Sequence, residues 1–315
     1  MPDAAIARPR IGAPSSFRGL RFAFFAWGVL AYNLAVVLWG AYVRATGSGA
    51  GCGNHWPLCD GPVTSQTPAG ATAIEFTHRV TSGWDVILVA VLVVWAFRAF
   101  PKRHYARLGA ALAAVFLVTE ALLGAALVLL NHVARNASSS RAWSLSAHLI
   151  NTLTLLACLA LAAWWGSGRA GFRLRGRAAW RAAVTLAVFA LLGISGAIAA
   201  LGDTLFPVNS LASGLARDFE ASANLFVRLR IWHPLIAAGA GAWFSYYALQ
   251  PGAGAISPMG KRLAYAALVL TGAQLAAGAL NLLMLAPVAL QLVHLLLADL
   301  LWIALVLLSA ERLRA

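Results

Sequence analysis

Eight long apolar runs divide this chain, and they constrain its fold more than any other feature. A run of about 20 apolar residues is long enough to cross the hydrocarbon core of a bilayer as a helix. Only 11% of the 315 residues are charged, whereas a soluble domain has about 25%. We therefore predict an all-α integral membrane protein with eight transmembrane helices. The predicted spans cover residues 22–43, 77–97, 107–130, 145–165, 180–201, 231–249, 262–285 and 288–309.

Positive charges are concentrated in alternate connections between these runs. Of the 24 Lys and Arg residues, 17 lie in the N-terminal tail, after the second, fourth and sixth runs, and at the C-terminus. Such residues are enriched in cytoplasmic loops, so we expect a multi-pass protein of the plasma membrane with both termini in the cytoplasm. The net charge of +14 then reflects topology. We expect no nucleic-acid partner, because no basic patch has interleaved aromatic residues.

The two halves of the chain repeat one another at a nearly fixed offset. Four runs in each half return the chain to its starting side, so both halves have the same orientation. We predict two parallel four-helix bundles related by a pseudo-two-fold axis along the membrane normal. The anchors of the repeat are Gly40 and Gly196, His78 and His233, Glu120 and Gln274, and His148 and His294. The expected domains are a cytoplasmic tail (1–21), an N-terminal bundle (22–165), a basic cytoplasmic linker (166–179) and a C-terminal bundle (180–310).

Each half presents a pair of histidines near the outer ends of its even-numbered spans: His78 and His148, then His233 and His294. Imidazole is a common ligand of transition metals and of heme iron. Facing helices of a four-helix bundle can hold a cofactor between them, so a bis-histidine heme in each half is the simplest interpretation. The alternative is ordinary bundle histidines that form hydrogen bonds between helices, and the matching positions in both halves favour ligands.

The two halves differ beside their first histidine. Glu75 precedes His78 by three residues, so the two share a face if this segment is helical. A carboxylate there could relay protons or stabilise developing positive charge. Arg230 occupies the corresponding place in the second half and suits a heme propionate. We infer that the first half performs chemistry and the second holds a permanent cofactor. The alternative for Glu75 is a carboxylate that only favours the helix dipole.

The outer end of the first half carries further polar residues. Cys52 and Cys59 lie in a Gly-rich outer loop, where thiols can oxidise to a disulfide. A zinc site that adds His55 to the two cysteines is the alternative, although a fourth ligand is not evident. Arg44 and Arg79 lie at the outer interface and are candidate partners of heme propionates, or they reach towards lipid headgroups.

Three more acidic residues lie within the predicted spans: Asp85, Glu120 and Asp299. Ionisable residues inside a membrane indicate a functional site by default. Glu120 corresponds to Gln274 in the second half, which indicates a polar packing position common to both halves. We therefore assign no catalytic role to Glu120 or Asp85 from the sequence.

Five strings, in this order along the chain, carry a resemblance to a known family: "GAYVRATGSGAGCGNHWPLC", "EFTHR", "SAHLINT", "WHP" and "QLVHLLLADLLW". They resemble the heme A synthase family of cytochrome oxidase assembly, and the resemblance covers nearly the whole chain. It is most specific in the first half. It implies eight helices in two four-helix bundles, each with a histidine pair for a heme.

The resemblance also implies an activity and a set of roles. The reaction oxidises a ring methyl group of heme O to a formyl group through a hydroxymethyl intermediate, which gives heme A. His78 and His148 would face the substrate heme O, with Glu75 as the catalytic carboxylate. His233 and His294 would ligate a resident heme b. The expected partners are heme O, heme A, an electron donor and heme O synthase or oxidase assembly factors, with a homo-oligomer as a further expectation.

One feature departs from the family pattern, and two other functions stay open. Some members have a second cysteine pair after the fifth span, where this chain has "GDTLFP", so a role that needs two pairs is in doubt. The duplicated histidine pairs alone would also suit a non-catalytic diheme b-type electron-transfer protein of the membrane. A transporter whose histidines only join helices is the third interpretation.

Overall fold

The structure is a computed structural model that describes residues 17–59, 69–220, 222–250 and 257–314. These residues form ten α-helices joined by short connections, so the prediction of an all-α protein is confirmed. The helices are α1 (Phe17–Ala45), α2 (Ala69–Ala99), α3 (Tyr105–Leu129), α4 (Ser139–Gly166), α5 (Gly176–Leu205), α6 (Leu211–Phe219), α7 (Leu225–Arg230), α8 (Trp232–Leu249), α9 (Pro258–Leu283) and α10 (Val288–Arg312). The predicted N-terminal tail lies mostly outside the described residues.

Seven of the described helices are long and apolar enough to cross a membrane, namely α1 to α5, α9 and α10. The chain is therefore a multi-pass membrane protein. The predicted span 231–249 corresponds to α8, an 18-residue helix that is not among these seven. An eighth crossing by α8 stays a prediction.

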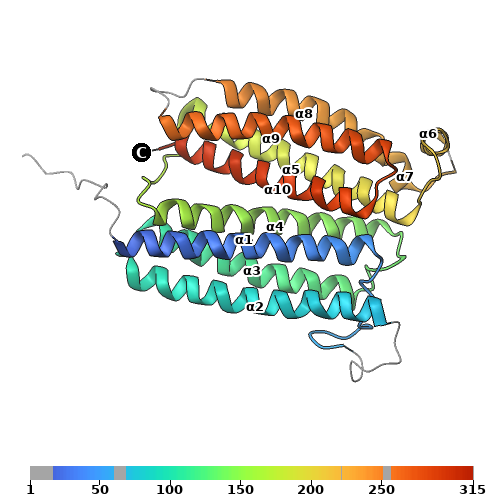
Figure 1. The fold of residues 1–315 in the computed structure, drawn as a ribbon, viewed down its shortest axis with the longest axis horizontal. Coiled ribbons are helices and arrows are strands. Elements are labelled where there is room, and N and C mark those ends of the chain that lie inside the picture. The colour runs from blue at the N-terminus through green and yellow to red at the C-terminus, as the bar shows by residue number, and fades with distance from the viewer. Residues whose placement is uncertain (1–16, 60–68, 221, 251–256, 315) are drawn as a thin grey trace, which may run out of the picture.

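The helices gather into two groups that follow the order of the chain. Figure 1 shows α1, α2, α3 and α4 in one group and α5, α8, α9 and α10 in the other. Most contacts between the groups are made by α4 with α5 and α10, and by α1 with α10. The beginning of α1 and the end of α10 lie at the same end of the molecule (Figure 1).

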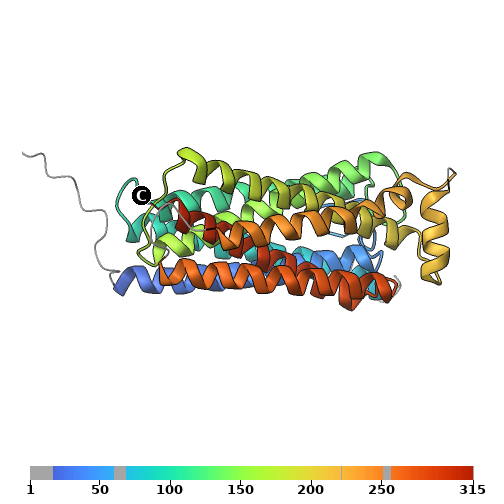
Figure 2. The same cartoon turned by 90° about the horizontal axis from the view of Figure 1, so that it is seen from above.

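The connection between α5 and α8 contains two short helices that the apolar runs did not predict. Helix α6 lies across the long axis of the molecule at the end remote from the C-terminus (Figure 2). Its Leu215 and Phe219 are exposed, while Gly214 is buried against the protein. A nine-residue helix with one apolar face is too short to stand out in a search for runs of about 20 residues.

The most deeply buried part of the protein lies where α4 and α10 meet. Leucines on one face of each helix are fully buried there, at the three- and four-residue spacing of a helix face. In a membrane such contacts stabilise the fold through close packing and interhelical hydrogen bonds. Trp302 of α10 donates a hydrogen bond of 2.7 Å from Nε1 to the carbonyl oxygen of Leu153 in α4. The buried leucines are Leu155, Leu156, Leu159, Leu301, Leu305 and Leu308.

Candidate functional site

The structure places the four candidate histidines on four different helices, two in each group. In the second group His233 begins α8 and His294 lies in α10, and their ring centroids are 6.5 Å apart with ring planes at 87°. In the first group His78 lies in α2 and His148 in α4, close enough to interact electrostatically. The members of each pair predicted from the sequence therefore lie near one another, within their own half.

The second pair has the spacing that a shared metal ion requires. Two imidazoles that each reach one ion over about 2 Å have ring centres about 6 Å apart, close to the 6.5 Å between His233 and His294. Nδ1 of His78 and Nδ1 of His294 are buried without a hydrogen-bond partner, although buried polar atoms normally have one. Two imidazoles are also a donor set that heme iron accepts. The residues present therefore fit a bis-histidine heme.

Each group has one polar side chain on its third long helix that contacts the second histidine. Glu120 of α3 has Oε1 3.1 Å from Nδ1 of His148, and Gln274 of α9 has Nε2 3.2 Å from Nε2 of His294. Asn151 also donates a hydrogen bond to the Glu120 carboxylate. The sequence had indicated only a common packing position here. The repeat correspondence of Glu120 and Gln274 was the signal, because it placed both at the same position in the third long helix of their half.

His233, like His148, is held through its Nδ1, but by a hydroxyl group in place of a carboxylate. Its Nδ1 lies 2.9 Å from Oγ of Ser195 in α5, and this contact leaves Nε2 free for a metal ion. A ligand histidine commonly uses its second nitrogen in this way, which fixes the ring orientation. The residue that corresponds to Ser195 in the first half is Trp39, whose Nε1 instead donates to the carbonyl of Ile74.

Glu75 is buried one turn before His78 on α2, and both of its oxygens have partners. Oε1 forms an ion pair of 2.5 Å with Nη2 of Arg79, on the next turn of the same helix. Oε2 accepts a hydrogen bond of 2.9 Å from the backbone N–H of Cys52. The carboxylate is thus ionically paired and fixed in position near His78. Its catalytic role stays a prediction.

Cys52 and Cys59, in the loop after α1, form a disulfide, which confirms that prediction. No group of three His, Cys, Asp or Glu side chains able to hold a metal ion occurs among the described residues, so the zinc alternative finds no support. Nη1 of Arg79 donates to three backbone carbonyls of the loop, those of His55, Pro57 and Leu58. Arg79 therefore joins the disulfide loop to the carboxylate of Glu75.

The other two candidate propionate partners also have protein partners. Arg44 of α1 donates to the Ala200 carbonyl at 3.0 Å and to the Thr204 hydroxyl at 2.9 Å, both in α5. It also donates to Oε1 of Gln291 in α10 at 3.0 Å, so it joins the two groups of helices.

Arg230 contacts two acidic residues at the end of the second group that is remote from the C-terminus. Its Nε lies 2.6 Å from Oδ1 of Asp218, and its Nη1 lies 3.3 Å from Oδ1 of Asp203. Its Nη2 donates to the carbonyl of Gly214. Sequence reasoning missed these carboxylates because they lie 12 and 27 residues away, on other helices. A propionate contact would have to share the guanidinium with them, and that contact stays a prediction.

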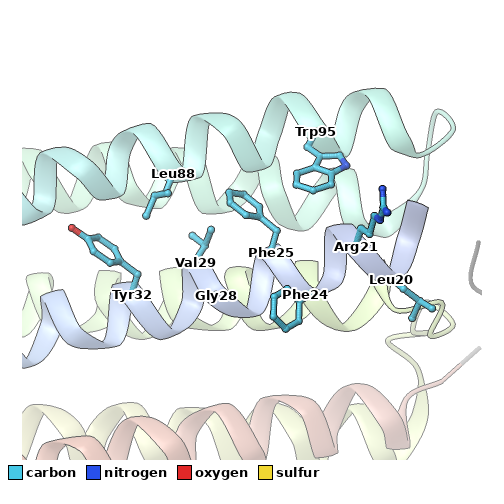
Figure 3. A pocket seen from close by; sticks show the side chains of 9 residues that line it. All are labelled: Leu20, Arg21, Phe24, Phe25, Gly28, Val29, Tyr32, Leu88 and Trp95. Atoms are coloured by element: carbon cyan, nitrogen blue, oxygen red, sulfur yellow. The ribbon is translucent and has the colours of Figure 1, made fainter. Parts of the chain in front are cut away.

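The remaining polar groups lie away from the histidines or have no defined partner. Asp85 is fully buried and accepts a hydrogen bond from the amide of Asn33. Oδ2 of Asp299 is buried in α10 without a hydrogen-bond partner. Figure 3 shows a groove of about 730 Å³ between α1 and α2 that contains none of the candidate site residues. Its lining consists of Leu20, Arg21, Phe24, Phe25, Gly28, Val29, Tyr32, Leu88 and Trp95.

Comparison with known proteins gives a family match over most of the chain. Residues 23–306 match the model of the COX15-CtaA family, described as cytochrome oxidase assembly protein. The chain is also 51% identical over 300 residues to a protein of Thermus thermophilus named protoheme IX farnesyltransferase. That alignment covers 93% of this chain and 48% of the relative, so the chain spans about half the length of that relative.

Shorter regions of the chain are similar to proteins named heme A synthase. The identity is 37% over 109 residues for the protein of Exiguobacterium sp., covering 35% of this chain and 36% of the relative. It is 38% over 125 residues for the protein of Halalkalibacterium halodurans, covering 40% of this chain and 41% of the relative.

Proposed function

Because the chain belongs to the COX15-CtaA family of cytochrome oxidase assembly proteins, we propose that it is a heme A synthase, which oxidises a ring methyl group of heme O to a formyl group. A hydroxymethyl compound is the intermediate of this oxidation. The observation that carries the proposal is the presence of a partly buried histidine pair in each half of such a chain, with the second pair spaced at 6.5 Å. Relatives named heme A synthase support it.

The two pairs have different proposed roles. His78 and His148 hold the substrate heme O, and His233 and His294 hold a resident heme b, which supplies an electron-transfer centre when it is bound. Ser195 fixes His233 through Nδ1, and Gln274 contacts His294. Both partners in the second half are uncharged, as suits a site that only retains its cofactor.

The first half differs by having carboxylates at both of its histidines. Glu75 is the proposed catalytic group, which accepts a proton or stabilises positive charge near the substrate. The Arg79 guanidinium and the Cys52 N–H hold its two oxygens, so the carboxylate is already oriented before substrate binds. Glu120 in turn orients His148. Arg44, Arg79 and Arg230 are the proposed partners of heme propionates.

The proposed topology follows from the charge pattern and the helix order. Eight crossings, including α8, form two parallel four-helix bundles (22–165 and 180–310) joined by a cytoplasmic linker (166–179). Both termini face the cytoplasm from the plasma membrane, and the heme sites lie towards the outer face. The positions of the first and last helix ends at one end of the molecule support this arrangement (Figure 1).

The proposed partners are heme O, heme A, an electron donor and a heme O synthase, with other oxidase assembly factors and a second copy of the chain as further partners. The Thermus relative supports the link to heme O synthase. It is named protoheme IX farnesyltransferase, and only 48% of its length corresponds to this chain. A protein named as a farnesyltransferase therefore also contains a region similar to this chain.

Farnesyl transfer by this chain itself is the less favoured function. The family model that matches residues 23–306 is described as a cytochrome oxidase assembly protein, and relatives named heme A synthase match parts of this chain. The name of the relative would then describe the half that has no counterpart here. A non-catalytic diheme electron carrier is the second alternative, favoured by the presence of a histidine pair in both halves.

One experiment separates these functions. The chain is co-expressed with a source of heme O, and the extracted hemes are identified by mass. We expect the wild-type protein to produce heme A. The Glu75→Ala variant should keep its bound heme but produce no heme A. Unchanged heme O from well-folded wild-type protein contradicts the proposal. Heme O formed from protoheme and farnesyl diphosphate, by the chain expressed without the heme O source, would indicate farnesyl transfer. Two permanent hemes of one type would indicate an electron carrier.

A further inference from the structure

Each of the four candidate ligand histidines lies against a glycine of the long helix that precedes its own in the same group. The pairs are Gly40 with His78, Gly124 with His148, Gly196 with His233 and Gly278 with His294. Gly40 and Gly196 correspond in the repeat, and so do Gly124 and Gly278. The same glycine–histidine contact therefore occurs twice in each half.

These contacts are too close for a side chain at three of the four glycines. A Cβ atom would lie 2.9 Å from Cε1 of His78 at Gly40, and 3.0 Å from Cε1 of the facing histidine at Gly196 and at Gly278. Carbon atoms in good contact are about 3.5–4.0 Å apart. At Gly124 the nearest atom, Nε2 of His148, would be 3.6 Å away, which is an ordinary contact.

Two other glycines of the same helices, Gly28 and Gly272, face no side chain. A Cβ atom at Gly28 of α1 or at Gly272 of α9 would have nothing within 4 Å. Glycine is less favourable than alanine inside a helix. The close approach of a histidine ring therefore explains why glycine occupies positions 40 and 278. No such contact explains Gly28 and Gly272.

The four rings also differ in what else holds them. His148, His233 and His294 each have a side-chain partner, namely Glu120, Ser195 and Gln274. Nδ1 of His78 is buried without any partner. Packing against Gly40 is therefore the main constraint that the described residues place on the ring of His78.

We propose that Gly40, Gly196 and Gly278 are positioning residues. Their missing side chains let Cε1 of the facing imidazole lie close to the neighbouring helix, and this contact sets the direction of the ring towards the iron. The proposal rests on the proposed heme sites. It predicts a graded series: alanine at Gly40 has the largest effect, alanine at Gly196 or Gly278 a clear one, and alanine at Gly124 little.

The first test measures heme binding in single variants of the full chain, purified and titrated with heme b. Gly278→Ala should weaken binding at the second site by at least ~10-fold, as loss of an orienting contact does at metal sites, and shift its low-spin spectrum. Gly40→Ala should do the same at the first site only. The matched controls Gly272→Ala and Gly28→Ala should bind as the wild type does. Equal behaviour of Gly278→Ala and Gly272→Ala overturns the proposal.

The second test needs no heme, so it stays informative if a glycine variant is destabilised. Thermal unfolding of the heme-free chain is compared for Gly278→Ala in the wild-type and in the His294→Ala background. We expect Gly278→Ala to lower Tm only where His294 is present, because His294→Ala removes the ring that the new methyl group would strike. The same Tm shift in both backgrounds overturns the proposal. Failure to produce heme A would overturn the proposed function. It would not change the result of this comparison of Tm shifts in the two backgrounds.

Discussion

Oε1 of Glu120 lies 3.1 Å from Nδ1 of His148, whereas the corresponding residue of the second half, Gln274, presents an amide 3.2 Å from His294. The same place in the repeat therefore holds a negative charge in one half and a neutral group in the other. A carboxylate that accepts from an imidazole N–H raises the basicity of the ring as a ligand. This difference provides a direct test of whether the two sites are electronically distinct.

We expect Glu120→Gln to make the first site resemble the second. The heme at the first site should stay bound, and its reduction potential should rise by roughly tens of millivolts, because a less basic imidazole stabilises ferric iron less. A spectroscopic redox titration of the purified protein measures the change. Gln274→Glu is the matched variant and should lower the potential of the second site. An unchanged potential in both variants would contradict this account.

A second prediction concerns the link between Arg79 and the disulfide loop. Arg79→Ala removes three hydrogen bonds to the carbonyls of the loop and the ion pair with Glu75. Each lost hydrogen bond to a charged group costs about 1.5–3 kcal/mol, so the loop should open more often. Faster hydrogen exchange at residues 48–59 and faster reduction of the Cys52–Cys59 disulfide by dithiothreitol would show it. Arg98→Ala, at the other end of α2 where the side chain is exposed, should leave both rates unchanged.

A third prediction concerns the contact between the two groups of helices. Trp302→Phe keeps an aromatic ring in the buried interface but removes the hydrogen bond from Nε1 to Leu153. The expected loss of stability is about 1 kcal/mol, seen as a lower Tm in the same detergent. Trp180→Phe is the control, because Trp180 is 71% exposed and should contribute little. Equal Tm values for Trp302→Phe and the wild type would mean that this bond does not stabilise the interface.

A fourth prediction concerns pH at the connection between α2 and α3. His104 lies just before α3, where its Nδ1 accepts a hydrogen bond of 3.1 Å from the N–H of Ala106 and its ring stacks on Phe100. Burial lowers the pKa of His104 below its ordinary value of 6.5. The folded protein thus binds this proton less readily than the unfolded chain does.

The sign of the pH effect follows from this lowered pKa. The contribution of His104 is fully present above pH 6.5 and is lost as the pH falls below that value, because protonation removes the acceptor that caps α3. Hydrogen exchange at residues 105–107, corrected for the intrinsic rate, should therefore show more frequent opening at pH 5 than at pH 8. His104→Asn keeps a capping acceptor that does not titrate and should abolish the difference. A variant with the wild-type pH dependence would contradict the assignment.

Much of the framework was accessible from local patterns. The apolar runs indicated an all-α membrane protein, and the structure bears this out with seven helices suited to crossing. The paired cysteines of the outer loop are joined as expected, and the resemblance to the heme A synthase family agrees with the family match over residues 23–306. These features depend on neighbouring residues in the chain, and hydropathy and spacing report such features directly.

The contacts of the arginines and acids were not accessible in this way. Arg44 binds groups of α5 and α10, and Arg230 binds two carboxylates on other helices. Neither partner set has a regular spacing from its arginine. Only the packing of the helices brings these groups together, so sequence reasoning left both arginines without protein partners.

The sequence by itself determined that the chain is helical, lies in a membrane, belongs to a family and carries two histidine pairs in a repeated order. The tertiary structure decided what each histidine touches. It placed a carboxylate at His148, an amide at His294 and a hydroxyl at His233, and it seated each ring against a glycine of a neighbouring helix. The physical reason is that a repeat in the sequence specifies the position of each histidine along its helix. The orientation of its imidazole depends on the side chains of the facing helix, including those that glycine lacks.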